Sequence, residues 1–319
     1  MIPRILLESK NPQGKPYQYR VPSRVASAGP RGYKGGLLLP TAKVGRTALE
    51  SLTPLPQPPM SILNRSSPPQ WEYPKYEAGE PVALFIPCYI DQFFPQIAQS
   101  TARLLTRFGV PVVFPEEQTC CGQPAFNSGY WEEAKGVIHH FCNVFRPHRW
   151  IVSPSGSCTA MCRVFFGHVD PDERIVGVGS RVFELTEFLV EILGVTDTRA
   201  YFPHKVTMHS GCHGRRELGV FEQPLELLKN VRGLTYCELP NIEECCGFGG
   251  TFSVKMPGMS LAMGRTKVEN IVKSGADVVV SVDISCLMHV GGMLRRDPAT
   301  RHIRTLHIAE VLDAGTDGE

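Results

Sequence analysis

Residues 243–251 read EECCGFGGT and place two adjacent cysteines, Cys245 and Cys246, in front of a glycine-rich turn. A disulfide between neighbouring residues would strain the backbone that joins them, so the pair is not expected to form one. The stretch QTCCGQPAF at 118–126 repeats the Cys-Cys-Gly core and lacks the later glycines. The repeated element is therefore a pair of thiols followed by one glycine.

Two further cysteines accompany each pair at nearly constant spacing, which indicates an internal repeat. The first cysteines of the two halves lie 124 residues apart, the Cys-Cys-Gly motifs 125 apart, and the last cysteines 128 apart. Three positions in one register are very improbable by chance for a residue as scarce as cysteine. We predict four site cysteines in each half: Cys88, Cys120, Cys121 and Cys158, then Cys212, Cys245, Cys246 and Cys286.

Short apolar runs alternate with amphipathic stretches from residue 81 onward, which is typical of parallel sheets covered by helices. The predicted strands are 81–87, 110–115, 149–154, 204–209, 234–239 and 276–282. The predicted helices are 93–109, 129–145, 224–233, 261–275 and 305–312. We therefore expect an α/β protein of two tandem strand–helix repeats.

The first eighty residues have a different composition, with 13 of the 27 prolines and 11 Lys/Arg against 5 Asp/Glu. Proline at this density removes backbone donors and disfavours helix and inner strand. We predict an irregular, basic, proline-rich arm over 1–78, a first cysteine-rich repeat over 79–200 and a second over 201–319. A poorly ordered tail is favoured for the arm over a segment that wraps a partner.

The outer cysteines of each half follow predicted strands, and the Cys-Cys-Gly motif lies between a strand and a helix. Loops at the carboxyl edge of a parallel sheet converge around a crevice, so each half can gather four thiolates. Four such anions need a cation, which favours a soft metal or an iron–sulfur cluster. Gly122 and Gly247 are predicted to contact the cofactor, because glycine tolerates positive φ and a close approach of the backbone.

These cysteines and their flanking residues resemble the duplicated cysteine-rich CCG domain. The domain occurs in a subunit of heterodisulfide reductase, the glycolate oxidase iron–sulfur subunit and the lactate-utilisation protein A family. The last is the most similar, through 115–134, 153–158, 227–234, 245–256, 283–292 and 307–312. The resemblance spans about 82–313 and implies an electron-transfer subunit in oxidation of L-lactate to pyruvate, with two iron–sulfur partner subunits. It implies a subunit of an oxidoreductase rather than a complete enzyme.

The expected cluster type rests on a difference from the heterodisulfide reductase subunit. In that subunit, the last cysteine of the set is the first residue of a CxxC motif. Here Cys162 follows Cys158 one residue too late, and His289 stands where the second half would place its cysteine. Two ordinary [4Fe-4S] clusters on four cysteines each are therefore expected, with zinc in one half as an alternative. A glycolate oxidase or heterodisulfide or quinone reductase type of subunit, and a zinc-stabilised binding module without redox function, are the alternative functions.

Other polar residues and cysteines receive structural interpretations. Core packing is predicted for Cys142, Cys237 and Cys162, and a fifth-ligand role for Cys162 or His289 is the less favoured alternative. His209 and His213 flank Cys212, and hydrogen-bonded loop positions are favoured for them over tuning of a cluster or proton relay. Residues 247–250 (GFGG) lack the full pattern of a nucleotide-binding loop.

The bulk composition is that of an ordinary globular protein, at 42% apolar and 20% charged residues with a net charge of +2. This charge favours neither nucleic acid nor a membrane surface as partner, and no apolar run approaches the ~20 residues of a membrane helix. The first residues lack the pattern of a secretory signal. Eleven cysteines then point to a reducing, cytoplasmic location.

Overall fold

The computed structural model describes residues 73–315 of this chain. The chain divides into two units, 1–52 and 53–319, so every described residue belongs to the second unit. Most of the predicted proline-rich arm, up to residue 72, lies outside the described residues. Residues 73–78 of that arm are described and form neither helix nor strand.

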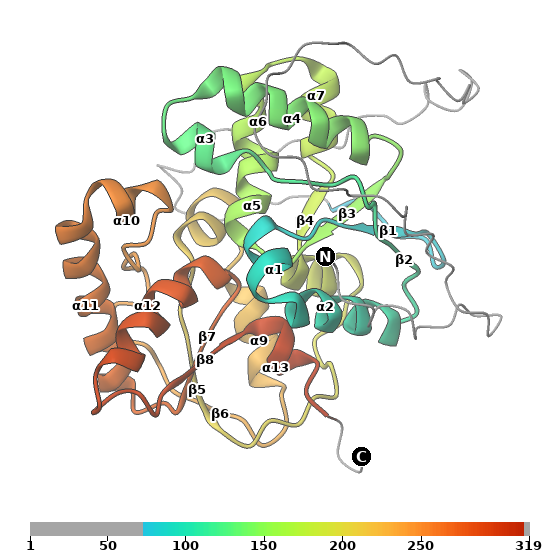
Figure 1. Ribbon diagram of the computed structural model, residues 1–319. Helices are drawn as coiled ribbons and strands as arrows, with labels where there is room; N and C mark the ends of the chain where they lie inside the picture. The colour runs from blue at the N-terminus through green and yellow to red at the C-terminus, as the bar shows by residue number, and fades with distance from the viewer. Residues whose placement is uncertain (1–72, 316–319) are drawn as a thin grey trace, which may run out of the picture. The chain divides into compact units, whose positions relative to one another are not determined.

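Two four-stranded parallel sheets form the framework, one in each half of the described chain (Figure 1). The strand orders are β2-β1-β3-β4 and β6-β5-β7-β8, so the second sheet repeats the topology of the first. The bounds are β1 Val82–Leu84, β2 Val112–Val113, β3 Trp150–Ser153, β4 Val182–Glu184, β5 Lys205–Met208, β6 Thr235–Tyr236, β7 Val278–Ser281 and β8 Arg304–His307. The predicted α/β class with parallel sheets in two halves is confirmed.

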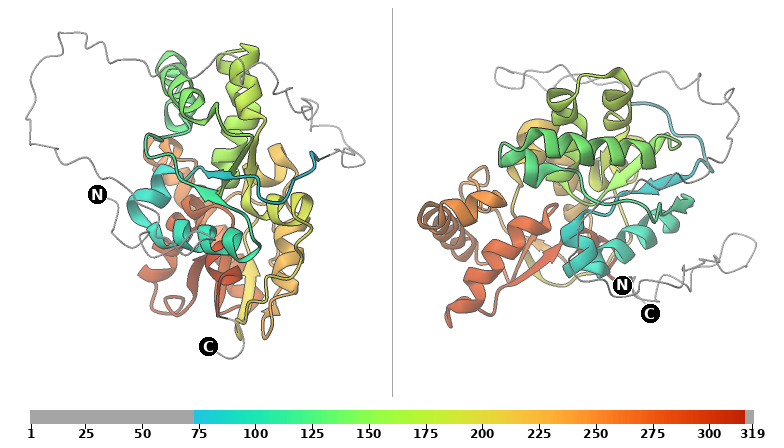
Figure 2. Two further views of the ribbon diagram at one scale, coloured as in Figure 1. Left: turned by 90° about the vertical axis from the view of Figure 1, so that its right-hand side faces the viewer. Right: turned by 45° about the horizontal axis from the view of Figure 1, so that its top comes forward.

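Helices connect the strands and cover the sheets. The first half contains α1 Cys88–Phe93, α2 Pro95–Arg107, α3 Gln123–Asn127, α4 Trp131–Phe145, α5 Gly156–Ala160, α6 Phe166–Val169, α7 Glu173–Gly179 and α8 Leu185–Glu187. The second half contains α9 Glu222–Lys229, α10 Thr251–Lys255, α11 Pro257–Ser274, α12 Ile284–Arg296 and α13 Ile308–Leu312. Three π-helical segments are Met161–Phe165, Phe188–Ile192 and Gly214–Leu218. Helices α4, α6 and α7 lie on one side of the described region, and α10 and α11 lie on another (Figures 1 and 2).

The strand order places a topological switch point in each sheet. The chain leaves β1 toward β2 on one side and returns to β3 on the other, and β5, β6 and β7 repeat this path. Loops that leave neighbouring strands in opposite directions open a crevice at the carboxyl edge, where ligands of such sheets bind. The carboxyl ends of β1 and β3, and of β5 and β7, are therefore where the topology predicts a site.

Alternating side chains of the first sheet divide the interior into two cores. Ala83 and Phe85 face helices α4 and α6, where Phe85 and Phe141 meet edge to face with ring centroids 4.8 Å apart. Val82 and Leu84 face the opposite way, into a core that also contains Val206 and most of the second sheet. The two halves therefore share one continuous hydrophobic core, which stabilises their packing against each other.

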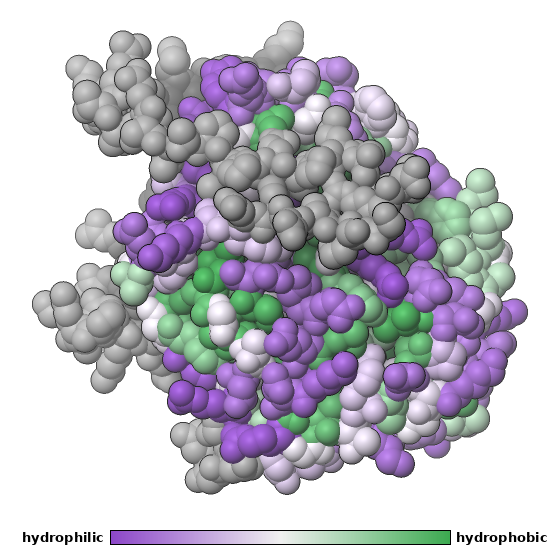
Figure 3. Space-filling model, turned by 180° about the vertical axis from the view of Figure 1, so that it is seen from behind, coloured by the Kyte–Doolittle hydropathy of each residue, from purple (hydrophilic) through white to green (hydrophobic). Residues whose placement is uncertain are grey.

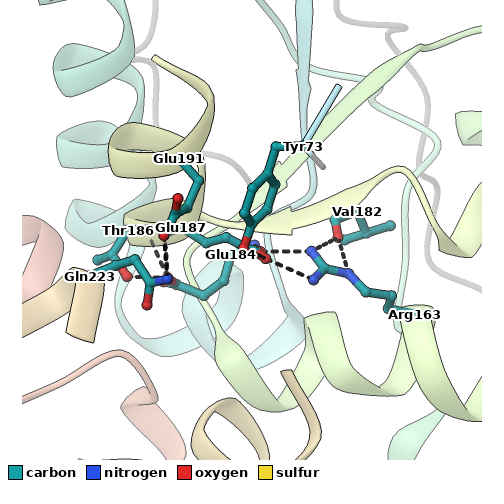
Figure 4. Close-up of polar contacts among 8 residues, drawn as sticks. All are labelled: Tyr73, Arg163, Val182, Glu184, Thr186, Glu187, Glu191 and Gln223. Atoms are coloured by element: carbon teal, nitrogen blue, oxygen red, sulfur yellow. Dashed lines mark hydrogen bonds and ion pairs between the residues drawn. The ribbon is translucent and has the colours of Figure 1, made fainter. Parts of the chain in front are cut away.

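A buried ion pair fixes the end of β4 (Figure 4). Arg163 lies in the π-helical segment after α5 and donates two hydrogen bonds to the carboxylate of Glu187, at 2.9 and 2.7 Å. The same guanidinium donates to the Val182 carbonyl at 2.7 Å. Both side chains are almost completely buried, so the pair ties the segment after Cys158 to the adjacent strand. Gln223 of the second half donates to Glu191 at 2.6 Å beside this cluster.

Four details differ from the sequence prediction. The predicted helix 305–312 is wrong in its first part, because Arg304–His307 form strand β8 before α13 begins at Ile308. The predicted helix 93–109 is interrupted at Phe94, since Pro95 occupies the first position of α2. Strand β4 was not predicted, and the core placement of Cys237 is wrong because this residue is half-exposed.

Among the described residues, no helix is both long enough and apolar enough to cross a membrane. The face seen from behind shows hydrophobic residues in separate areas between hydrophilic ones (Figure 3). Such a distribution is usual for the surface of a globular protein. No disulfide forms, and all eleven cysteines, which lie within the described part, are free.

Candidate metal centre

One cavity of about 140 Å³ receives residues from the carboxyl edges of both sheets. All eight site cysteines line it, so the structure brings together every cysteine that the repeat predicts. The set from the first half is Cys88, Cys120, Cys121 and Cys158, and the set from the second half is Cys212, Cys245, Cys246 and Cys286. The spacing predicted two thiol-rich sites, and the packing of the halves turns these two sites toward the same space.

In the first set, the sulfurs come from three segments that meet at the switch point of the first sheet. Cys88 is the first residue of α1, and its Sγ lies 3.9 Å from the Sγ of Cys120. Cys158 lies in the first turn of α5, and its backbone N–H donates to the Ser155 hydroxyl at 3.3 Å. Cys121 and Cys158 are buried, whereas Cys88 and Cys120 are half-exposed.

Hydrogen bonding among these thiols concentrates negative charge on Cys120. Bonds from Cys121 and Cys88 lower the pKa of Cys120 to about 3, and the backbone N–H of Gly122 also donates to its Sγ at 3.4 Å. The hydrogen bond with Cys120, together with burial, raises the pKa of Cys88 well above its usual range. The set therefore behaves as one electrostatic unit, since each sulfur changes the ionisation of the next.

The second set repeats this arrangement on β5 and β7. Bonds from Cys212 and Cys246 lower the pKa of Cys245 to about 2, and the N–H of Gly247 donates to its Sγ at 3.4 Å. The N–H of Phe248 donates to the Sγ of Cys246 at 3.4 Å, which gives this set a second amide donor. Cys286 lies in the first turn of the 13-residue helix α12, where the helix dipole favours an anionic sulfur. A hydrogen bond from Cys246 lowers the pKa of Cys286 to about 7.

Both motif glycines adopt the backbone conformation that the sequence led us to expect. Gly122 has φ +87° and Gly247 has φ +86°, a region that residues with a side chain rarely adopt. In this conformation each amide points back toward the first cysteine of its motif. A Cβ on Gly247 would also lie 2.6 Å from the Ser260 carbonyl oxygen, so helix α11 closely covers the second turn.

The cavity has a wall made by both halves. The Asp283 carboxylate, at the start of α12, accepts hydrogen bonds from the hydroxyls of Ser155 and Ser157 at 2.9 and 2.8 Å and from the Ser157 N–H at 3.0 Å. Tyr89, beside Cys88, meets Phe248 edge to face with centroids 6.0 Å apart. These contacts cross between the two sulfur sets and hold them at one cavity.

The donor set fits a metal or an iron–sulfur cluster in each half. Four cysteine sulfurs are the ligands of both [4Fe-4S] clusters and structural zinc. Among the described residues, no lysine or arginine lines the cavity, so no side-chain cation is placed there to offset four thiolates. A bound cation or cluster would balance the charge of four ionised sulfurs.

Comparisons with known proteins agree with this geometry. The family model named CCG, a cysteine-rich domain, matches residues 82–163 and 206–291, which include all eight site cysteines. Lactate utilization protein A of an Exiguobacterium species is 48% identical over 241 residues, covering 73% of this chain and 97% of the relative. This chain belongs to the lactate utilization protein A family.

A second family member gives the same result. Lactate utilization protein A 2 of Bacillus cereus is 44% identical over 239 residues, covering 73% of this chain and 98% of the relative. Among solved structures, a hypothetical protein from Helicobacter pylori has a TM-score of 0.44 at 10% identity, over 74% of this chain and 50% of that chain. A likeness at that level carries no functional argument, so the family assignment rests on the sequence matches.

The two candidate fifth ligands lie outside the cavity lining in this family member. Cys162 is 1% exposed and packs in the core of the first half, as predicted. His289 lies with Nε2 3.4 Å from the Ser260 hydroxyl of α11. His213 does line the cavity, and its Nδ1 lies 3.6 Å from the Sγ of Cys212.

Asp283 was not predicted as part of the site, and a site role for His209 was the less favoured of two alternatives. Asp283 follows a predicted strand and precedes a site cysteine, and this place in the sequence was a usable signal for it. His209 was expected to be an ordinary hydrogen-bonded loop histidine. The structure buries His209 to 1% exposure and leaves both ring nitrogens without a hydrogen-bond partner among the described residues.

Proposed function

We propose that this chain is an iron–sulfur electron-transfer subunit in the oxidation of L-lactate to pyruvate. The observation that carries the proposal is the convergence of two four-cysteine sets on one cavity, in a chain that belongs to the lactate utilization protein A family. Oxidation of a 2-hydroxy acid to a 2-oxo acid releases two electrons and two protons. An iron–sulfur cluster in each set would supply one-electron redox chemistry.

The roles of the protein residues follow from their contacts. The eight cysteines would hold the two clusters, and the amides of Gly122, Gly247 and Phe248 stabilise negative charge on the sulfurs. The shared wall of Asp283, Ser155 and Ser157 keeps the two sets at one cavity, which suits transfer of electrons between them. Activation of lactate and removal of its protons are assigned to a partner, because the roles proposed for this chain include no acid or base.

Partners and location follow from the same family. We propose that the chain works with the other iron–sulfur subunits of a lactate-oxidising complex. The eleven free cysteines are consistent with a cytoplasmic location, where thiols stay reduced.

A single observation favours zinc in one half as the second candidate. The 3.9 Å separation of the sulfurs of Cys88 and Cys120 is close to the edge of a tetrahedron whose corners lie ~2.3 Å from a central zinc ion. A zinc ion would fix the first half without carrying electrons. Metal analysis of the full chain distinguishes this candidate, since it gives zinc in addition to iron.

The decisive experiment is metal and sulfide analysis of the full chain purified without oxygen, combined with absorption and EPR spectra. We expect iron with labile sulfide, and a broad absorption near ~400 nm. The variant Cys245→Ser should lose about half of the iron, and should fail to restore growth on L-lactate in a strain that lacks the native gene. Cys237→Ser is the matched control, because Cys237 is half-exposed and lies outside the cavity lining. A colourless protein with zinc and no iron, or full growth with Cys245→Ser, would refute the proposal.

A further inference from the structure

The residues that surround the two sulfur sets differ at equivalent positions. The first such position directly follows β1 in one half and β5 in the other. The N–H of Phe85 donates to the Val152 carbonyl at 2.9 Å, and the N–H of His209 donates to the Val280 carbonyl at 2.8 Å. Phe85 and His209 thus occupy the same place in the two repeats, three residues before the first cysteine of each set. The first half places a phenyl ring there, and the second half places an imidazole.

The first half uses its ring as an ordinary core residue. Phe85 is fully buried, and it meets Phe141 and Phe145 edge to face, at centroid distances of 4.8 and 5.7 Å. A ring of this kind offers no donor or acceptor to the sulfurs of Cys120 or Cys121. The first sulfur set therefore has an apolar neighbour on this side.

The second half uses its ring differently. One ring nitrogen of His209 and the sulfurs of Cys246 and Cys286 all lie within 4.8 Å of one another. His209 is 1% exposed, and neither ring nitrogen has a hydrogen-bond partner in the described part of the chain. An unpaired buried polar group is destabilising, so the residue needs a partner that the sulfur site can supply.

We propose that His209 is a direct polar partner of the second centre, donating a ring N–H to its sulfurs, and that the two centres of this chain are therefore inequivalent. The inference rests on the proposed function, since it concerns the clusters that the cysteines would hold. A hydrogen bond to cluster sulfur stabilises the reduced, more negative state and raises the reduction potential. His209 is a positioning and tuning residue, whereas Phe85 leaves the first centre without this stabilisation.

Nearby charges do not replace this donor. Lys267 is buried in α11, and its Nζ donates to the Asn241 carbonyl at 2.9 Å, in the loop before Cys245. Its charge interacts with the carboxylate of Glu244, which also accepts a hydrogen bond from Asn270 at 2.9 Å. The lysine Nζ is held by the Asn241 carbonyl and its charge is shared with Glu244, so it does not replace a ring N–H of His209 beside Cys246 and Cys286.

The test is a redox titration of the full, iron-loaded chain followed by EPR, with pulsed EPR to detect nitrogen coupling. Wild type should show two reduction steps, with resolved ¹⁴N coupling from the His209 ring to one centre. His209→Phe should keep the iron and sulfide content and lose that coupling. It should also lower the reduction equilibrium constant of one step at least tenfold, about 59 mV for one electron, without moving the other. His209→Gln, which retains an N–H donor, should restore part of the shift.

The control is His289→Phe, which removes a histidine of the same half that is hydrogen-bonded to Ser260 and does not belong to the close group of His209, Cys246 and Cys286. It should leave both steps unchanged. Unchanged potentials and coupling in iron-loaded His209→Phe, or a shift produced by His289→Phe alone, would overturn this inference and leave the proposed function standing. Protein that contains zinc and no iron would overturn both. Loss of iron in His209→Phe with full iron in His209→Gln would support direct contact of residue 209 with the second centre.

Discussion

Alanine substitutions at the two motif glycines form a matched pair. Comparing them measures how closely helix α11 packs against the second Cys-Cys-Gly turn. Gly122 and Gly247 have nearly identical φ, at +87° and +86°, so an alanine at either position incurs a similar backbone penalty of about 1–2 kcal/mol. Their surroundings differ. The nearest atom to a Cβ at Gly122 would be the Ala134 carbonyl oxygen at 3.5 Å, which is an ordinary contact. A Cβ at Gly247 would lie 2.6 Å from the Ser260 oxygen and 2.8 Å from the Met263 Cβ.

This difference in surroundings sets how far each substitution should lower the free energy of unfolding. Gly122→Ala should lower the free energy of unfolding by about 1–2 kcal/mol through backbone strain alone. Gly247→Ala should lose a further ~1–3 kcal/mol, because helix α11 must shift to admit the methyl group. Movement of α11 would also displace the amide that donates to the Sγ of Cys245, so this variant should release bound metal faster.

Urea unfolding followed by far-UV circular dichroism, with metal release to a chelator measured in parallel, tests both magnitudes. The midpoint for Gly247→Ala should fall on the order of 0.5–1 M below that for Gly122→Ala. Gly136→Ala is the control, since Gly136 lies on α4 and no atom lies within 4 Å of the place its Cβ would take. This control variant should be neutral or slightly stabilising. Equal losses for the two motif variants, or a larger loss at Gly122, would refute the packing argument.

Two further predictions concern the polar cluster at the end of β4. Arg163→Met should destabilise the chain by about 3–5 kcal/mol in thermal or urea unfolding, because it leaves the Glu187 carboxylate buried without its cation, and Arg163→Met/Glu187→Met should recover most of the loss. Burial raises the pKa of Glu184 to about 8. The unfolded chain releases this proton at a lower pH than the folded chain does. The free energy of unfolding therefore falls as pH rises from about 4.5 to 8. Glu184→Gln should match wild type near pH 4.5 and exceed it by on the order of 3 kcal/mol at pH 7, and parallel pH profiles of unfolding would contradict this.

Cysteine spacing was sufficient to predict the eight candidate site cysteines, and the alternation of apolar runs with amphipathic stretches was sufficient to predict the α/β class. A parallel strand ends in a loop at a fixed edge of its sheet, so cysteines that follow predicted strands converge whatever the exact strand bounds are. Two of the four edge strands, β4 and β8, were harder to predict. Val182–Glu184 has three residues, and Arg304–His307 has a single apolar side chain, Leu306, directly before an apolar helix. In the second case the His307 side chain caps α13 together with Glu310, and this capping box marks where strand ends and helix begins.

The shared cavity could not be predicted in the same way. Matching cysteine spacing indicates that the two halves have the same fold. It does not indicate which faces of the halves pack against each other. That orientation depends on contacts between distant segments, such as the core that joins Leu84 to Val206 and the ion pairs of Arg103 and Arg107 with Asp313. The sequence favoured an ordinary loop position for His209 over cluster tuning for a related reason. Its burial beside Cys246 and Cys286 depends on how three loops fold together.

The contact between the halves shows why a duplicated site need not be symmetric. Ser155 and Asp283 are equivalent positions, each three residues before the last cysteine of its set, and they hydrogen-bond directly to each other at 2.9 Å. Two aspartates meeting there would repel, and two serines would leave the Ser157 amide without its carboxylate acceptor. A serine opposite an aspartate satisfies both sides, so close packing of the repeats itself favours different residues at equivalent positions. Phe85 and His209 are a second pair of different residues at equivalent positions. Once the halves are held unequally, each sulfur set can be given its own electrostatic surroundings, and two centres at one cavity can differ in potential.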